Sequence, residues 1–191
     1  MDLLLTLALG IGLSAASGFR VFVPPLVLSV MAQTTNLALP GSLSFLDSPV
    51  AALIFGVAAV AEVLAYYIPW IDNILDTLAA PAALIAGVLP TYAFGAELDP
   101  GARWALAIVA GGGAAGGVQA LTSVTRLLST GTTGGLGNGV VATGENVAAT
   151  GLSLLAIFLP FIAVAFVIAL IVVAVRQIGR LRRRRASQVS T

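Results

Sequence analysis

The sequence predicts an all-α, polytopic helical membrane protein, and three observations support this fold class. Hydrophobic residues make up 59% of the 191-residue chain, whereas charged residues make up only 9%. The mean hydropathy is +1.05, and the apolar residues gather in stretches that approach or exceed the roughly 20 residues a membrane-spanning helix needs. A soluble domain carries about a quarter charged residues because its surface faces water. The composition therefore excludes a soluble enzyme, a nucleic-acid binder and a disordered protein.

Five apolar stretches are the predicted membrane spans. They cover residues 3–31, 50–68, 77–94, 103–127 and 145–176. The first stretch is interrupted by Arg20 and the pair Pro24-Pro25, and the last contains Pro160. We interpret the last stretch as one kinked helix, because its neighbours offer nothing polar for a turn exposed to water. A break at Pro160 would instead give six spans.

The charge distribution predicts the orientation. All nine basic residues are arginines, and six of them lie between Arg176 and Arg185. By the positive-inside rule, the C-terminus is cytoplasmic in a multi-pass protein of the inner or plasma membrane. We expect a single transmembrane domain over residues 1–178 and a basic cytoplasmic tail over residues 179–191.

With five spans, the N-terminus would lie outside the cell, residues 95–101 would be cytoplasmic and residues 128–144 external.

A weak internal similarity relates residues 3–20 to residues 109–126. It pairs Arg20 with Arg126 and Ser17 with Ser123. Each arginine ends a helix of small residues and precedes a helix breaker, a pattern typical of transporters built from inverted repeats. Two inverted halves, residues 1–94 and 102–178, are therefore a further hypothesis.

Arg20 is the strongest candidate for a functional residue. An arginine at the centre of a membrane costs about 2.5–3.5 kcal/mol on insertion scales, so it should face a polar partner or a wet cavity. Glu62, which also lies inside a span, is the expected partner. The pair would form either a solute site or a structural ion pair, and Arg20 could also extend to the membrane interface.

A second candidate region follows Arg126 and is rich in glycine and hydroxyl groups. Its candidate binding residues are Thr130, Thr132, Thr133 and Asn138. Glycines allow successive backbone N–H groups to form an anion-binding nest, so the region could be a re-entrant, pore-lining loop. The alternative is a flexible external loop.

Glu145 has two readings of its own. Thr143 could cap the last helix, with Glu145 in the first turn, or Glu145 could pair with Arg126. The small residues 111–117 suggest close helix packing or a hinge. Tyr66, with other aromatic residues, is interpreted as part of an interfacial belt.

The stretches Ser14–Pro24 and Thr125–Asn138, together with Glu145-Asn146, resemble a known family, domain of unknown function 4126. The resemblance extends from about Leu3 to about Pro160. It implies a polytopic membrane protein, mostly bacterial, and no activity.

The absence of cysteine and histidine removes thiol and imidazole chemistry. Carboxylates alone could still bind a hard cation, but we expect no enzyme, no cofactor and no metal site. We expect a small transporter or channel for an anionic or zwitterionic solute. Its substrate site would comprise Arg20, Glu62, Arg126, Ser17, Ser123, Thr130, Thr132, Thr133, Asn138 and Glu145. The alternative is a non-transporting membrane scaffold or assembly factor. The expected partners are the lipid bilayer, a small solute or ion and a second copy of the chain, but no nucleic acid.

Overall fold

The computed structural model describes residues 2–35 and 37–189, without the side chains of residues 69, 70, 72, 73, 76, 174 and 177–189. Every regular element in these ranges is helical, as predicted. The elements are α1 (Leu3–Ser17), α2 (Val23–Thr35), the 3-10 helix η1 (Gly41–Leu46), α3 (Pro49–Ala65), α4 (Pro69–Phe94), α5 (Pro100–Leu106), the π-helix η2 (Ala107–Gly112), α6 (Gly113–Thr133), α7 (Asn138–Phe158) and α8 (Pro160–Val189).

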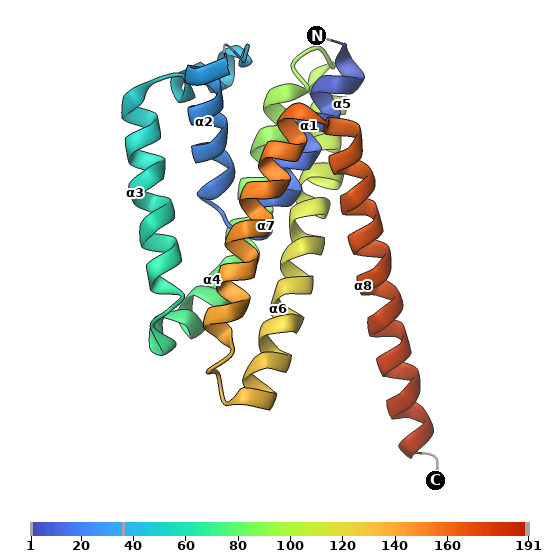
Figure 1. Ribbon diagram of the computed structural model, residues 1–191. Coiled ribbons are helices and arrows are strands. Elements are labelled where there is room, and N and C mark those ends of the chain that lie inside the picture. Colours follow the sequence, from blue (N-terminus) through green and yellow to red (C-terminus); the bar gives the residue numbers. More distant parts are fainter. Residues whose placement is uncertain (1, 36, 190–191) are drawn as a thin grey trace.

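The long helices run between the two ends of an elongated bundle (Figure 1). The N-terminus, η1 and the turns after α4 and α7 lie at the upper end in that view, whereas the turns after α3 and α6 lie at the lower end with the C-terminus. The prediction that residues 95–101 share a side with the C-terminus, and that residues 128–144 lie opposite it, is therefore wrong. Helix α1 contacts α4, α6, α7 and α8 and so occupies the middle of the bundle.

The first apolar stretch is a helical hairpin rather than one span. Helix α1 descends from the upper end, residues 18–22 turn, and α2 returns to the same end, so the hairpin tip lies near mid-height (Figure 1). Pro24 and Pro25 occupy the first turn of α2, where the missing N–H groups break no helical hydrogen bond. Gly18 permits close packing at the tip, because a Cβ there would lie 2.3 Å from the carbonyl oxygen of Ala115.

The last apolar stretch forms two helices, α7 and α8, which run in opposite directions from Leu159 (Figure 1). The predicted single kinked helix is therefore wrong. The N–H of Leu159 donates to the carbonyl of Leu155 at 2.8 Å, and the carbonyl of Leu159 accepts from the N–H of Ala163 at 3.0 Å. Pro160, which has no N–H, begins α8. The turn needs no polar residue because the backbone of Leu159 is fully paired.

Small residues allow α4 to approach η2 and α6 closely, as expected for residues 111–117. A Cβ on Gly87 would lie 2.3 Å from the Cβ of Ala115, and a Cβ on Gly111 would lie 2.6 Å from the carbonyl oxygen of Gly87. A larger side chain at Gly87 or Gly111 would therefore force these helices apart.

Helix α6 is unbroken through Arg126 and ends at Thr133, and it is capped by Gly134, whose φ of 65° favours glycine. The prediction that Arg126 ends its helix is therefore wrong, so the two arginines do not occupy matching positions at helix ends, although α6 does end at the predicted breaker, Gly134-Gly135. The division into halves at residues 94 and 102 stays a prediction.

Among the described residues, three helical stretches are long and apolar enough to cross a membrane: Thr77–Phe94, Pro100–Thr133 and Asn138–Phe158. Three shorter apolar helices accompany them: Leu3–Ser17, Pro49–Ala65 and Pro160–Val173. Large apolar side chains on the outside, such as Leu53, Val57 and Val147, are exposed, as expected of a surface that contacts lipid. Helix α8 extends to Val189, but the arginine side chains of the predicted basic tail lie outside the described residues.

Candidate functional site

Arg20 lies at the hairpin tip and is buried, with 1% of its surface exposed. Its Nε donates to Oδ1 of Asn146 at 2.6 Å, and its Nη2 donates to the carbonyl of Ala142 at 3.1 Å. The same Nη2 lies 3.1 Å from Oε2 of Glu145. Its Nη1 is buried and has no hydrogen-bond acceptor among the described residues. A buried donor without an acceptor is costly, so an oxygen atom supplied to Nη1 would be stabilised there.

Arg126 reaches the same carboxylate from α6. Its Nε donates to Oε1 of Glu145 at 3.0 Å, and its Nη2 forms a second, ion-paired contact with Oε2. Arg126 and Glu145 are 3% and 6% exposed. Because α7 begins at Asn138, Glu145 lies well inside the helix, and the reading of Thr143 as its cap is wrong. The pairing of Glu145 with Arg126 is confirmed, and Glu145 serves Arg20 as well.

Tyr66, at the end of α3, faces both guanidinium groups. The Cζ atoms of Arg20 and Arg126 lie 3.9 Å and 4.1 Å from the centre of its ring. Cation–π contacts of this kind contribute about 0.5–2 kcal/mol each. Tyr66 is buried, so its assignment to an interfacial belt is wrong. Its spacing of four residues from Glu62 places both on one face of α3, and that spacing could have indicated its position.

Glu62 binds the backbone of the hairpin tip instead of the Arg20 guanidinium, so the predicted Arg20–Glu62 pair is wrong. Its Oε1 accepts from the N–H of Val21 at 2.9 Å, and its Oε2 accepts from the N–H of Phe22 at 3.1 Å. Both N–H groups lie immediately before α2, where a carboxylate is favoured by the helix dipole. Glu62 therefore attaches the hairpin tip to α3.

Two cavities border the group formed by Arg20, Arg126, Glu145 and Tyr66, which we call the arginine cluster. One cavity of about 270 Å³ is bordered by Glu145 together with residues of α6 and α7. The other, of about 370 Å³, is bordered by Tyr66, Glu62, Gln119 and apolar residues of α3 and α4. Of the cluster, Glu145 borders the first cavity and Tyr66 the second, whereas neither Arg20 nor Arg126 lines either one.

The hydroxyl residues predicted after Arg126 lie at the exposed lower end of the bundle. Thr130 exchanges hydrogen bonds with the side chain of Asn138 at 3.1 and 3.3 Å. Thr132 and Thr133 donate to backbone carbonyls of their own helix, and Thr133 accepts from the N–H of Gly137. These contacts form the turn between α6 and α7, so the predicted re-entrant loop is wrong.

The two predicted serines have local roles. Ser17 is buried and donates to the carbonyl of Leu13 at 3.1 Å, and Ser123 accepts from Nε2 of Gln119 at 3.4 Å. Sequence reasoning overlooked Asn146, which binds Arg20 directly. Its position next to Glu145 was the available signal.

The fold and the cluster define a class: a polytopic helical membrane protein that carries a buried Arg–Glu–Arg group at the tip of a helical hairpin. Residues 7–180 match the family described as a domain of unknown function, DUF4126. The chain therefore belongs to that family, as its motifs predicted. No curated protein and no solved structure matches the chain.

Proposed function

We propose that the protein is a small membrane transporter or channel for an anionic or zwitterionic solute, with the arginine cluster as its central polar site. The main support is a buried guanidinium donor of Arg20 that has no acceptor among the described residues. This donor is Nη1, and the two buried guanidinium groups of the cluster face one carboxylate. The other nearby carboxylate, Glu62, is engaged by two backbone N–H groups.

The position of the cluster also supports this proposal. Arginine is costly inside a membrane and is usually retained there for a solute or ion pathway. Irregular backbone at membrane depth, such as residues 18–22, occurs where it lines a cavity or is enclosed by protein. The two cavities that border Glu145 and Tyr66 would supply access from different directions.

For the orientation, we propose a multi-pass protein of the inner or plasma membrane with a cytoplasmic C-terminus. The arginines between Arg176 and Arg185 support this by the positive-inside rule. The turn between α6 and α7 would then also be cytoplasmic, and the N-terminus external, because these features lie at opposite ends of the bundle (Figure 1).

The second candidate function is a non-transporting membrane scaffold. One observation favours it: Glu145 binds both arginines while the ring of Tyr66 lies against them, so the cluster joins the hairpin to α3, α6 and α7. Such a purely structural cluster needs no solute, and the scaffold predicts no uptake above that of empty vesicles.

Uptake into proteoliposomes distinguishes the two functions, with chloride as the anionic probe and glycine as the zwitterionic probe. The variants Arg20→Lys and Arg126→Lys keep the positive charge but lose the planar, bidentate group. We expect uptake of at least one probe by the unaltered protein and a strong reduction in both variants. Arg103→Lys is the matched control, because Arg103 also binds a backbone carbonyl and stacks on a tyrosine, Tyr92. Uptake of neither probe, or equal uptake by all variants, would contradict the proposal.

A further inference from the structure

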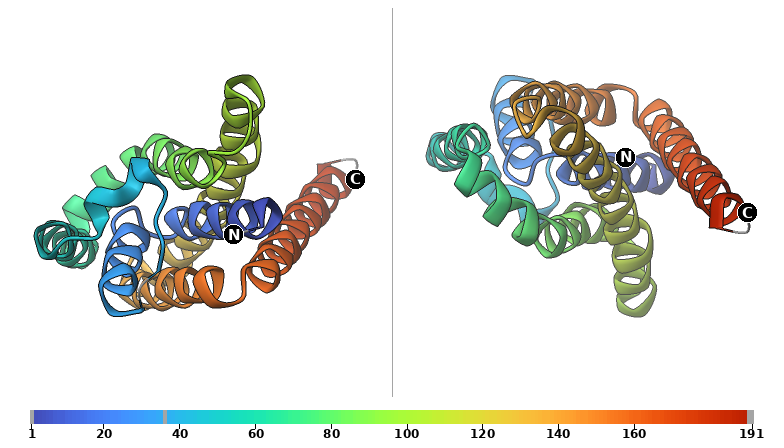
Figure 2. Two further views of the ribbon diagram at one scale, coloured as in Figure 1. Left: turned by 90° about the horizontal axis from the view of Figure 1, so that it is seen from above. Right: turned by 90° about the horizontal axis from the view of Figure 1, so that it is seen from below.

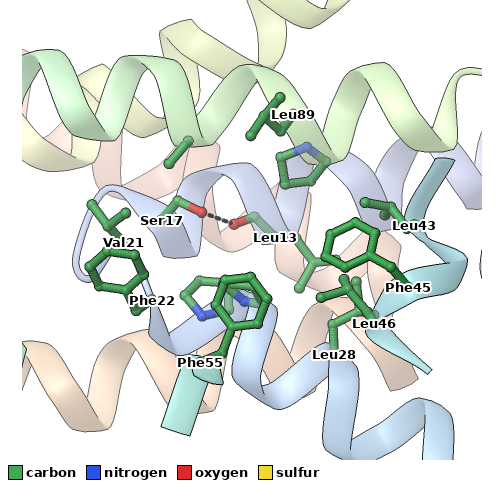
Figure 3. A pocket seen from close by; sticks show the side chains of 14 residues that line it. Leu13, Ser17, Val21, Phe22, Leu28, Leu43, Phe45, Leu46, Phe55 and Leu89 are labelled. Carbon is green, nitrogen blue, oxygen red and sulfur yellow. Dashed lines mark hydrogen bonds between the residues drawn. The ribbon is translucent and has the colours of Figure 1, made fainter. Parts of the chain in front are cut away.

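A third cavity borders the hairpin tip, and its lining is almost entirely apolar. This cavity, of about 200 Å³, is partly open and is lined by residues of α1, α2, η1, α3, α4 and the hairpin tip. Figure 3 shows the rings of Phe22, Phe45 and Phe55 around it, with leucines from α1, α2, η1 and α4 filling the remaining wall. We call it the upper cavity.

The upper cavity offers nothing that would hold a charged solute. Its one polar side chain is that of Ser17, and this hydroxyl donates to the carbonyl of Leu13 within α1 (Figure 3). An ion placed there would lose its hydration without gaining a partner. A hydrocarbon chain has no polar group to desolvate and would form dispersion contacts with the wall. The chemistry of the wall therefore selects an apolar occupant.

The surroundings of the upper cavity indicate where that occupant comes from. Helix α3 stands at the edge of the bundle (Figure 2), packs mainly on α2 and touches α4 little. Phe55 of α3 borders the cavity, while Leu53, Ile54 and Val57 of the same helix are exposed on its outer side. In a membrane protein this outer side contacts lipid tails, so a single helix separates the cavity from hydrocarbon. The weakly packed seam between α3 and α4 is a route between them.

We propose that the upper cavity binds an acyl chain of a membrane lipid, which enters between α3 and α4. The chain would lie against Phe22 and Val21, and these two residues also border the cavity that contains Glu62 and Tyr66. The occupant would therefore contact the hairpin tip next to Arg20. This binding is independent of the transport proposed above, because it requires neither the arginine cluster nor solute movement.

Photolabelling of the full chain tests the proposal. The protein is reconstituted in phosphatidylethanolamine and phosphatidylglycerol vesicles that contain a phosphatidylcholine with a diazirine at the end of one acyl chain, and labelled residues are identified by mass spectrometry. We expect labels on buried cavity residues such as Leu13 and Leu28, in addition to the lipid-facing residues of α3. Labels confined to outward residues such as Leu53 and Val57 would overturn the proposal, whatever the result of the uptake assay.

Two variants separate cavity binding from general contact with lipid. Ala86→Phe adds a ring to the cavity wall, and we expect it to cause a several-fold loss of cavity labelling. Ala80→Phe is the matched control, because it adds the same ring to an exposed position of the same helix; it should leave the labelling unchanged. If Ala86→Phe does not fold, Leu43→Trp narrows the cavity from η1. Unchanged cavity labelling in a folded filling variant would also overturn the proposal.

Discussion

The carboxylate of Glu145 lies 3.1 Å from the guanidinium of Arg20, which joins the hairpin tip to the middle of α7. The same carboxylate also binds Arg126, so one acidic side chain forms ion pairs with two buried arginines from different parts of the chain. Removing one partner from a buried ion pair leaves an uncompensated charge in a medium of low dielectric constant. The following predictions depend on this arrangement and on the packing around it.

We expect Glu145→Gln to be strongly destabilising. The variant keeps the shape of the side chain but leaves Arg20 and Arg126 without a counter-charge, and breaking a buried pair in this way costs about 3–5 kcal/mol. Thermal denaturation of the purified protein in detergent would show a large decrease in midpoint. Glu97→Gln, which alters an exposed carboxylate, is the control and should have almost no effect. Similar midpoints for the two variants would show that Glu145 is not essential to the cluster.

At Tyr66, the aromatic ring should matter more than the size of the side chain. Tyr66→Phe keeps a ring beside both guanidinium groups, whereas Tyr66→Leu removes two cation–π contacts, each contributing about 0.5–2 kcal/mol. We expect the unfolding midpoint of the leucine variant to lie clearly below that of the phenylalanine variant. Equal midpoints would contradict a stabilising role for the ring.

Glu62 should control the protection of the hairpin tip from hydrogen exchange. In Glu62→Ala, the N–H groups of Val21 and Phe22 lose their acceptor, at a cost of about 1–3 kcal/mol for each group that stays buried. We expect faster amide exchange in the peptide that contains both residues. Glu62→Gln retains one acceptor oxygen and should show an intermediate rate. Unchanged exchange in Glu62→Ala would mean that the tip is held by other contacts.

The close approach of α4 to α6 should tolerate no side chain at Gly87. The added Cβ of Gly87→Ala would lie 2.3 Å from the Cβ of Ala115, and overpacking of this kind typically costs about 1–3 kcal/mol. Gly113→Ala is the matched control, because nothing lies within 4 Å of its added Cβ. That variant should be neutral or slightly stabilising, since alanine is the better helix former. Denaturation midpoints in the same detergent compare the two.

Much of the fold could be predicted from the sequence because it depends on simple quantities. Low charge content and apolar stretches established a helical membrane protein, and the cost of burying Arg20 and Arg126 predicted polar partners for both. The turn at Leu159 could not be predicted from polarity. It is stabilised by two backbone hydrogen bonds, which leave no trace in hydropathy.

The identity of the residue that pairs with Arg20 could not be predicted from the sequence either. Glu62 and Glu145 were both acidic residues in apolar surroundings, and the choice between them depends on which helices meet at the hairpin tip. Packing places α7 beside Arg20 and directs Glu62 to the backbone N–H groups of Val21 and Phe22. Single-residue patterns carry no information on that choice.

The stability of a triple variant tests the central claim most directly: two buried arginines depend on one carboxylate. The variant Arg20→Met, Arg126→Met, Glu145→Gln removes all three charges, and replacing a buried ionic group by apolar residues is often neutral or stabilising. Its unfolding midpoint is compared with that of Glu145→Gln alone. We predict that the triple variant recovers much of the stability that the single variant loses. The account would be contradicted if the triple variant had a lower unfolding midpoint than Glu145→Gln. The three side chains would then contribute to stability independently and would not form one cluster.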